Sequence, residues 1–220
     1  IFYWCPFIDK VATVKAVINS CEGLQRYTKN KIPYIIDAAG EFDGFEKSLK
    51  NKNISLIKLS KYSYINKLPK YGFIMSRLTY IIIFLLSFNK LRKLLINEKP
   101  DYFIVHLITS LPIILFLLFN FKTKLILRIS GLPKLNILRK IFWRLSRNRI
   151  YLITSPTNET RKHLINQKIF NSDKIITLKD PIVNIREINI KKKEIIDDKT
   201  INKSKYFLSI GRLTEQKNFK

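Results

Sequence analysis

The fold is decided by the stretch Tyr102-Phe103-Ile104-Val105-His106-Leu107-Ile108-Thr109-Ser110-Leu111-Pro112, near the middle of the 220-residue chain. The apolar run that begins here continues to Phe121 and is long enough to cross a membrane, but polar residues and a proline interrupt it. A buried strand, a turn and an apolar helix explain these interruptions better than one spanning helix. Another apolar run follows at Lys124–Ile129, so the segment predicts a strand-helix-strand unit.

The same alternation of short apolar runs and segments with helical spacing recurs along the chain. It is typical of an α/β, Rossmann-like fold with a doubly wound parallel sheet. We predict strands at Ile1–Cys5, Tyr34–Ala38, Ile54–Lys58, Tyr102–His106, Lys124–Ile129, Ile150–Thr154, Ile175–Leu178 and Tyr206–Ile210. We predict helices at Thr13–Lys29, Ser76–Asn97, Leu111–Asn120, Asn136–Arg147 and Pro156–Gln167, the last with Ser155 as its N-cap and Glu159 in its first turn.

The charge of the chain is strongly basic, with a formal net charge of +25 and a pI of about 10.1. Such a surface attracts anions, so nucleic acid, anionic phospholipid and phosphorylated substrates all fit. A coding bias that scatters solvated lysines over the surface is the alternative explanation. The two cysteines, Cys5 and Cys21, have neither the spacing of a redox pair nor the density of a secreted disulfide scaffold, which favours the reducing cytoplasm.

Another apolar segment raises the question of membrane contact. Leu78–Phe88 is apolar for only about eleven residues, which is too short to span a bilayer. Phe84–Leu95 places apolar residues beside Lys90, Arg92 and Lys93, as in a helix that lies in the membrane interface. A core-packing helix with a basic outer face is the alternative.

The two ends of the sequence predict a fragment of a longer protein. The chain begins with Ile1 inside an apolar run and stops soon after a predicted strand and loop. Residues 184–205 are polar and charged without clear periodicity, which indicates a linker. We therefore expect a first domain at 1–183, a linker at 184–205 and the start of a second domain at 206–220.

The strongest functional signal is Phe207-Leu208-Ser209-Ile210-Gly211-Arg212-Leu213-Thr214-Glu215-Gln216-Lys217-Asn218-Phe219. It resembles the strand and loop that begin the C-terminal domain of family 4 glycosyltransferases. The resemblance implies the N-terminal half of a GT-B fold plus the first strand of a second Rossmann-like domain, with Arg212 and Lys217 on the diphosphate of a nucleotide sugar. Two cations can neutralise a departing nucleoside diphosphate without a metal, and Gly211 allows a tight turn. An exposed loop with two ordinary surface cations is the alternative.

Two further segments resemble parts of the same family. The Pro-Asp dipeptide and apolar strand that precede His106 resemble a segment whose histidine faces the interdomain cleft, which implies a catalytic His106 that contacts the donor sugar or its phosphate. A buried structural histidine is the alternative. Arg128, Ser130 and Gly131 resemble a segment of members that build bacterial surface polysaccharides, which implies that they line the cleft. An ordinary strand-helix turn explains them equally simply.

The chain also departs from the family pattern at two places. The turn after the first strand, residues 7–14, contains no glycine, so family-style backbone contacts to donor or acceptor are not expected there. Asp180-Pro181 stands where the family commonly has Asn-Pro.

These patterns predict an enzyme rather than a binding protein. The sequence contains no Walker loop, no nucleophile elbow, no metal-spaced His/Cys cluster and no Asp-x-Asp pair, so we expect neither a metal nor a cofactor.

The resemblance implies a retaining glycosyltransferase that moves sugar from a nucleotide-diphosphate donor to a lipid-linked or polysaccharide acceptor in cell-surface polysaccharide synthesis. We expect it in the cytoplasm, at the anionic inner face of the cell membrane, and expect these 220 residues alone to be inactive. The alternative is a basic, non-enzymatic α/β protein that binds nucleic acid, although no recognised nucleic-acid motif is present.

Overall fold

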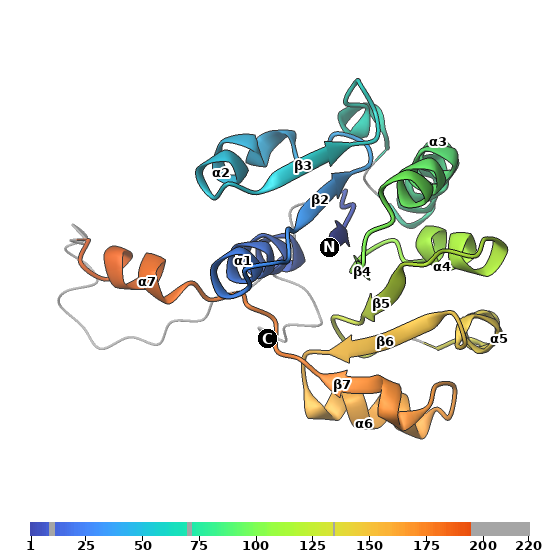
Figure 1. The fold of residues 1–220 in the computed structure, drawn as a ribbon. Coiled ribbons are helices and arrows are strands. Elements are labelled where there is room, and N and C mark those ends of the chain that lie inside the picture. The colour runs from blue at the N-terminus through green and yellow to red at the C-terminus, as the bar shows by residue number, and fades with distance from the viewer. Residues whose placement is uncertain (9–11, 70–71, 134, 195–220) are drawn as a thin grey trace. The chain divides into compact units, whose positions relative to one another are not determined.

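The computed structural model describes residues 1–8, 12–69, 72–133 and 135–194, in a chain that divides into the compact units Ile1–Ile182 and Val183–Lys220. The first unit contains a seven-stranded parallel sheet with helices packed on both faces (Figure 1). Its strands are β1 (Phe2–Trp4), β2 (Tyr34–Asp37), β3 (Ser55–Lys58), β4 (Tyr102–Val105), β5 (Lys124–Arg128), β6 (Ile150–Ser155) and β7 (Ile175–Thr177). Its helices are α1 (Ala12–Tyr27), α2 (Glu46–Asn51), α3 (Phe73–Glu98), α4 (Ser110–Leu118), α5 (Ile137–Ser146) and α6 (Asn158–Asn166), with short 3₁₀ turns η1 (Asp43–Phe45), η2 (Ile65–Lys67) and η3 (Ser172–Lys174).

The order of the strands is that of a doubly wound sheet: β3-β2-β1-β4-β5-β6-β7. The chain winds outward from β1 to β3, crosses back through α3 and winds the other way from β4 to β7. The predicted fold class is confirmed, and every strand predicted within the described residues is present to within two residues at either end. The predicted strand Tyr206–Ile210 lies outside the described residues.

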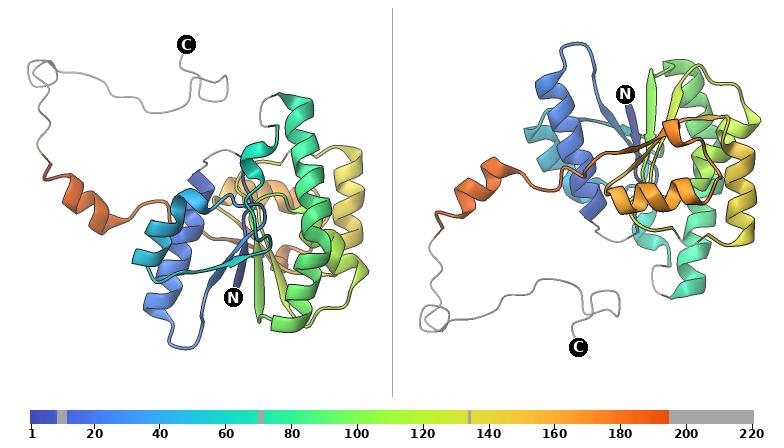
Figure 2. Two further views of the ribbon diagram at one scale, coloured as in Figure 1. Left: turned by 90° about the horizontal axis from the view of Figure 1, so that it is seen from above. Right: turned by 90° about the horizontal axis from the view of Figure 1, so that it is seen from below.

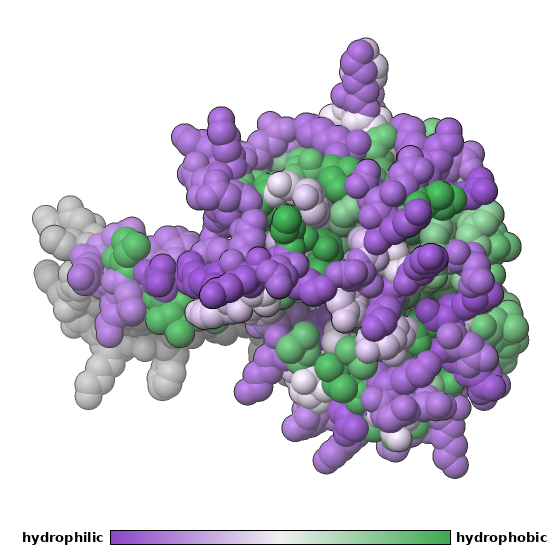
Figure 3. Space-filling model, in the orientation of Figure 1, coloured by the Kyte–Doolittle hydropathy of each residue, from purple (hydrophilic) through white to green (hydrophobic). Residues whose placement is uncertain are grey.

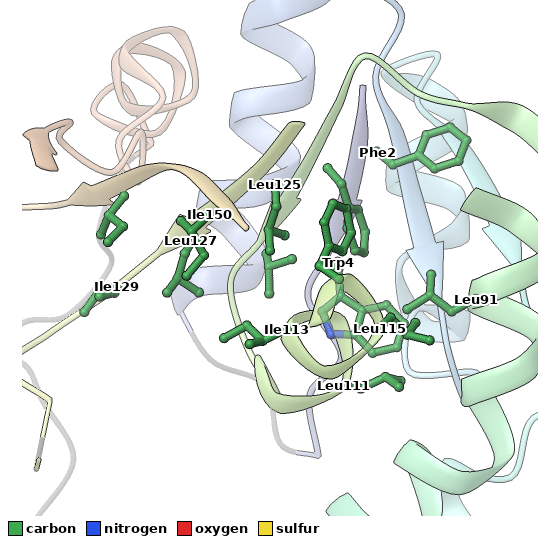
Figure 4. Packing of buried hydrophobic residues seen from close by; sticks show 14 of the residues in the cluster. Phe2, Trp4, Leu91, Leu111, Ile113, Leu115, Leu125, Leu127, Ile129 and Ile150 are labelled. Atoms are coloured by element: carbon green, nitrogen blue, oxygen red, sulfur yellow. The ribbon is translucent and has the colours of Figure 1, made fainter. Parts of the chain in front are cut away.

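Each strand near the centre of the sheet contributes side chains to two hydrophobic cores. Along β1 and just after it, Phe2 and Trp4 join the core on one face, whereas Tyr3 and Cys5 join the core on the other. Successive side chains of a strand point to opposite faces, so a strand buried on both sides must be apolar at every position. Figure 4 shows Trp4 packed with leucines and isoleucines of the larger core. This double burial explains the continuous apolar runs of the sequence.

The helices form two layers. Helices α1 and α2 cover the face of the smaller core, and α3, α4 and α5 lie on the other face (Figures 1 and 2). Helix α4 packs against both α3 and α5, which explains why Leu111, Ile113 and Leu115 are all fully buried and why the helix is apolar around most of its circumference. The apolar segment that continues to Phe121 therefore forms β4, a turn and α4, as predicted.

One predicted helix start is wrong. Strand β6 continues through Ser155, whose buried hydroxyl lies 3.3 Å from the carbonyl oxygen of Thr157, so Ser155 does not cap α6 and Pro156 does not begin it. The N-cap is Thr157, whose side chain accepts a hydrogen bond from the backbone N–H of Thr160 at 3.1 Å. Glu159 lies in the first turn, as predicted.

In the second unit, the described residues contain one short helix, α7 (Ile185–Lys191). The Asn184 side chain caps it by accepting hydrogen bonds from the backbone of Arg186 and Glu187. This helix occupies the start of the segment predicted as a linker, and the proposed domain boundaries remain predictions.

Candidate functional site

The candidate site lies where the order of the sheet reverses, at the carboxyl ends of β1 and β4. These neighbouring strands are followed by connections that leave in opposite directions, one through α1 to β2 and the other through α4 to β5. The loops after such strands diverge, and this edge is where open α/β sheets bind ligands. His106 is the first residue after β4, and its backbone N–H donates a 2.9 Å hydrogen bond to the carbonyl oxygen of Trp4. The histidine is thereby fixed at the reversal point.

The loop after His106 has an unusual backbone. Ile108 has a φ of +46°, a left-handed conformation that β-branched residues rarely adopt. Its carbonyl oxygen accepts a 3.2 Å hydrogen bond from the indole Nε1 of Trp4, a side chain that is fully buried. The hydrogen bond ties the loop after β4 to β1 and holds the strained residue in place.

The side chain of His106 is buried and neutral. It is 8% exposed, and its ring lies 6.0 Å from the Tyr3 ring between centroids. Burial, and secondly the positive charge of Arg128, lower the pKa of His106 to about 3. Its Nδ1 has no hydrogen-bond partner in the described part of the chain. A buried ring nitrogen without a partner is costly, so it is suited to a hydrogen bond with a ligand.

Arg128 is the second buried polar residue of the site. It ends β5 and is 3% exposed. Its Nη2 donates to Asp180 Oδ1 at 2.5 Å, whereas its Nη1 is buried with no partner among the described residues. Asp180 comes from the loop after β7. The guanidinium is thus oriented by one carboxylate and keeps donor capacity for an anion.

The other two residues predicted to line a cleft are on the surface. Ser130 and Gly131 follow β5 and are exposed. A Cβ atom built on Gly131 would have no other atom within 4 Å, so the structure imposes no steric need for glycine there. Their contact with a ligand remains a prediction.

A pair of buried carboxyl groups lies at the end of the neighbouring strand β2. Asp37 is 2% exposed and Glu41 is 6% exposed. Glu41 accepts backbone hydrogen bonds from Ala38 at 3.0 Å and Ala39 at 2.6 Å, and Asp37 accepts one from Gly40 at 2.7 Å. Burial, followed by the hydrogen bond and charge of Asp37, raises the pKa of Glu41 well above its usual 4.5. The pair therefore binds a proton more tightly than two separate carboxyl groups would.

Sequence reasoning placed His106 and Arg128 but missed Asp180, which pairs with Arg128, and the carboxyl pair at the end of β2. Asp37 ends β2 and lies within the predicted strand Tyr34–Ala38, so it could have been found from its position near the carboxyl edge. Asp180 was seen only as a departure from Asn-Pro, since nothing in the sequence pairs it with Arg128. No group of three or more His, Cys, Asp or Glu residues in the described part of the chain is arranged to hold a metal. Gly211, Arg212 and Lys217 lie outside the described residues.

Comparison with known proteins finds similarity only at the level of structure. No family model and no curated protein matches the chain. A UDP-GlcNAc 2-epimerase from Neisseria meningitidis, solved with UDP-GlcNAc, is 18% identical with a TM-score of 0.57, over 87% of this chain and 48% of that one. A glycosyltransferase from Rickettsia africae ESF-5 is 13% identical with a TM-score of 0.57, over 81% and 42%. A UDP-N-acetylglucosamine 2-epimerase from Rickettsia bellii is 11% identical with a TM-score of 0.56, over 88% and 48%.

These comparisons define the class of protein by its fold. The chain has the Rossmann-like α/β fold of about half of each neighbour, and it spans less than half of their length. Both epimerases and a glycosyltransferase share the fold, so the fold alone does not separate these two activities.

Proposed function

We propose that this chain is part of a glycosyltransferase that takes its sugar from a nucleotide-diphosphate donor and transfers it to a lipid-linked or polysaccharide acceptor. The observation that carries the proposal is the pair His106 and Arg128, each with a buried nitrogen that lacks a partner among the described residues, at the carboxyl ends of the neighbouring strands β4 and β5 beside the reversal point of the sheet. Buried polar nitrogens at this edge favour a ligand rich in hydroxyl and phosphate oxygens. The likeness to the fold of an epimerase solved with UDP-GlcNAc, and to that of a glycosyltransferase, supports the same ligand class.

The residues divide the proposed chemistry between them. In glycosyl transfer the bond between the anomeric carbon and the diphosphate oxygen breaks, and negative charge builds up on the leaving diphosphate. Arg212 and Lys217, which resemble the donor loop of family 4 glycosyltransferases, would stabilise that charge without a metal. His106, kept neutral by its low pKa, would hydrogen-bond a sugar hydroxyl or phosphate rather than act as an acid at neutral pH. Retention of configuration and a role in cell-surface polysaccharide synthesis follow from the same resemblance.

The first test is ligand binding by the full-length protein. We expect UDP, GDP or TDP at about 1 mM to raise the melting temperature at moderate salt. Arg212→Ala and Lys217→Ala should each weaken this binding by about 10- to 100-fold, because each removes a charge-assisted hydrogen bond worth roughly 1.5–3 kcal/mol. Lys29→Ala, which removes the same charge at an exposed position, is the matched control and should bind as the wild type does.

The second test identifies the reaction. We expect transfer of labelled sugar from the preferred nucleotide sugar to a lipid or polysaccharide extract, with loss of transfer in Arg212→Ala. Conversion of UDP-GlcNAc to its 2-epimer without any transfer would overturn the transferase in favour of an epimerase. Stabilisation by RNA or DNA, with none by nucleoside diphosphates, would instead support the nucleic-acid-binding alternative.

A further inference from the structure

The outer side of α3 carries an unusual stripe of exposed apolar side chains. The stripe contains Ile74, Leu78, Ile81 and Leu85, which are 75%, 44%, 55% and 66% exposed. Their spacing of four, three and four residues places them on one side of the helix. By length and composition the helix could cross a membrane. Only 22% of its most apolar 18-residue stretch is buried in the folded domain.

The buried residues of α3 show that the helix belongs to the folded domain. Ile83, Leu91 and Leu95 recur at four- or eight-residue intervals and are at most 1% exposed, within the larger core. A helix that packs one side on a sheet cannot also span a bilayer as a separate element. The exposed stripe is therefore a surface and not a membrane span.

Helix α5 repeats this arrangement. Ile137, Leu138, Ile141 and Leu145 are 76%, 77%, 47% and 67% exposed and lie on one side, whereas Trp143 faces the core at 6% exposure. A helix of a soluble domain normally turns its apolar side inward. Here, four large aliphatic side chains face outward in a helix of ten residues.

The two stripes lie on helices of the same layer. Helix α4 packs between α3 and α5, and all three lie on one face of the sheet (Figure 1). Figure 3 shows hydrophobic surface along the edge of the molecule where these helices lie in Figure 1. Leu118, at the end of α4, adds another aliphatic side chain that is 63% exposed. We call the exposed aliphatic residues of α3, α4 and α5 named above the outer apolar face.

The charge around this face is almost entirely positive. Helix α3 contains the exposed cations Arg77, Lys90 and Lys93 against a single acid, Glu98. Helix α5 contains Arg139, Lys140 and Arg144 and no acid, and Arg147 follows it directly. Basic residues that flank exposed aliphatic side chains are the combination that binds an anionic lipid surface, where apolar side chains reach the acyl boundary and cations contact headgroups.

We propose that the outer apolar face docks on an anionic phospholipid bilayer. The same-sign charge of +25 on every copy disfavours self-association through this basic face. Nucleic acid would contact the cations but would gain nothing from a row of isoleucines and leucines. A lipid surface satisfies both features at once.

The outer apolar face overlaps only in part with the segment that the sequence predicted for membrane contact. Of the predicted interfacial segment Phe84–Leu95, Leu91 and Leu95 are in the core, and Phe84 and Phe88 pack against it. The guanidinium of Arg92 lies 4.2 Å from the centre of the Phe119 ring, inside the helical layer. Leu85 of the outer apolar face lies within this predicted segment, and the other residues of the face lie earlier in α3, at the end of α4 and along α5.

Vesicle binding by the 220-residue chain tests the proposal. We expect co-sedimentation with vesicles of about 30% phosphatidylglycerol and 70% phosphatidylcholine at moderate salt, with at least about tenfold weaker binding to pure phosphatidylcholine. Leu138→Ser combined with Leu145→Ser should weaken binding to the anionic vesicles at least about tenfold, because both apolar contacts are lost. Tyr27→Ser combined with Ile32→Ser, which alters side chains that are 81% and 61% exposed outside this face, is the matched control and should bind normally.

A second measurement separates insertion from charge attraction. In the variant Leu145→Trp, with both native tryptophans retained, vesicles that contain brominated lipid should quench part of the fluorescence, and wild-type protein should show less quenching. Equal vesicle binding by the Leu138→Ser, Leu145→Ser variant and the wild type would overturn the proposal. Dimers that form with rising protein concentration and are lost in that variant would also overturn it, and would show that a second copy of the chain covers this face. RNA binding without vesicle binding would overturn it in favour of nucleic acid. Nucleotide sugar plays no part in these measurements, so their outcome is independent of the proposed enzymatic activity.

Discussion

The guanidinium of Arg128 donates a hydrogen bond to the carboxylate of Asp180 at 2.5 Å, across 52 residues of sequence. Arg128 ends β5 and Asp180 follows β7, so their ion pair connects two strands that are separated in the sheet by β6. The side chains are 3% and 18% exposed. The pair therefore joins the candidate site to the loop after the last strand of the sheet. Asp180 compensates the buried positive charge of Arg128.

Replacing the aspartate should destabilise the fold. Asp180→Ala leaves the buried Arg128 charge without its partner, and we expect the free energy of unfolding to fall by about 2–4 kcal/mol, somewhat less than for a fully buried pair because Asp180 is partly exposed. Asp180→Asn, which keeps an acceptor oxygen but loses the charge, should cost less. Urea denaturation at neutral pH measures both effects.

The exposed ion pair of Lys31 and Asp101 provides the control. Its side chains are 41% and 64% exposed, so solvent already screens the interaction. Asp101→Asn should shift the urea midpoint far less than Asp180→Ala does. Equal shifts would show that burial of Arg128 does not govern the strength of its pair.

The neutral state of His106 should appear as a pH dependence of stability. Its pKa is about 3 in the folded protein, below the ordinary value of 6.5, so the unfolded chain binds the proton more tightly between these pH values. Stability contributed by the neutral ring is complete above pH 6.5 and is lost as the pH falls toward 3, with a slope of at most about 1.4 kcal/mol per pH unit. His106→Gln should have a shallower loss of stability in urea denaturation as the pH is lowered from about 6.5 to 4.5.

Nuclear magnetic resonance gives an independent check on this histidine. The His106 ring signal, assigned by its absence in His106→Gln, should keep its neutral chemical shift from slightly alkaline pH down to the acid limit of the fold. Titration of that signal near the ordinary pKa of 6.5 would contradict the burial argument. Arg128→Met, which removes the second cause of the lowered pKa, should raise the His106 pKa without restoring its ordinary value.

The predictability of the fold follows from the double burial of its strands. A strand covered on both faces must be apolar at consecutive positions, which made the central strands visible in the sequence, whereas the edge strand β3 was found from a short apolar run although none of its residues is fully buried. Helix α2, with the sequence Glu-Lys-Ser-Leu-Lys-Asn, escaped prediction because six residues with Leu49 as the only buried one carry no periodic signal. The N-cap of α6 was misplaced because β6 is longer than predicted. Ser155 still belongs to β6 because it pairs with Thr177 of β7, and local sequence does not show this pairing.

The candidate site was predictable in its residues but not in their pairing. His106 and Arg128 follow or end apolar runs, and the carboxyl ends of parallel strands meet at one edge. That Asp180 reaches Arg128 depends on the strand order β5-β6-β7, which no local pattern reveals. The outer apolar face was hidden for a related reason, since periodicity shows that α5 has an apolar side but not which way that side faces.

The carboxyl pair at the end of β2 should contribute stability with the opposite pH dependence. The raised pKa of Glu41 means that the folded protein binds this proton more tightly than the unfolded chain does. The contribution is complete below the ordinary value of 4.5 and is lost as the pH rises through the raised folded-state pKa. Asp37→Asn removes the neighbouring carboxylate, so we expect a lower Glu41 pKa and a flatter stability profile above pH 4.5.

Measurement of that profile requires a background without the histidine. Urea midpoints between about pH 5 and 8 should vary less with Asp37→Asn than without it, when both proteins also carry His106→Gln to remove the histidine contribution. Carbon-13 shifts of the Glu41 carboxyl group give its pKa directly. A Glu41 carboxyl group that titrates near 4.5 in the wild type would contradict the coupling to Asp37.

Gly40, in the loop between Asp37 and Glu41, should be the glycine least tolerant of substitution among those described. Its φ is +89°, and a Cβ atom there would lie 2.1 Å from Ser63 Oγ and 2.7 Å from the Ser63 backbone Cα. The Ser63 region cannot easily move away, because the next two residues, Tyr64 and Ile65, both donate hydrogen bonds to the carbonyl oxygen of Ala39. We expect Gly40→Ala to lower the free energy of unfolding by at least about 1–3 kcal/mol, the usual cost of such a backbone conformation, with the clash in addition.

The loop offers both a control and a partial rescue for this substitution. Gly131→Ala places its methyl group where no other atom lies within 4 Å and should leave the urea midpoint nearly unchanged. Adding Ser63→Gly to Gly40→Ala removes the clashing hydroxyl and Cβ atoms, but the backbone of residue 63 still crowds the new methyl group and the φ stays unfavourable, so only part of the loss should be recovered. Full recovery of the urea midpoint in the double variant would assign the whole cost to the side-chain clash. An unchanged urea midpoint in Gly40→Ala alone would show that this loop rearranges freely and does not hold Asp37 and Glu41 in place.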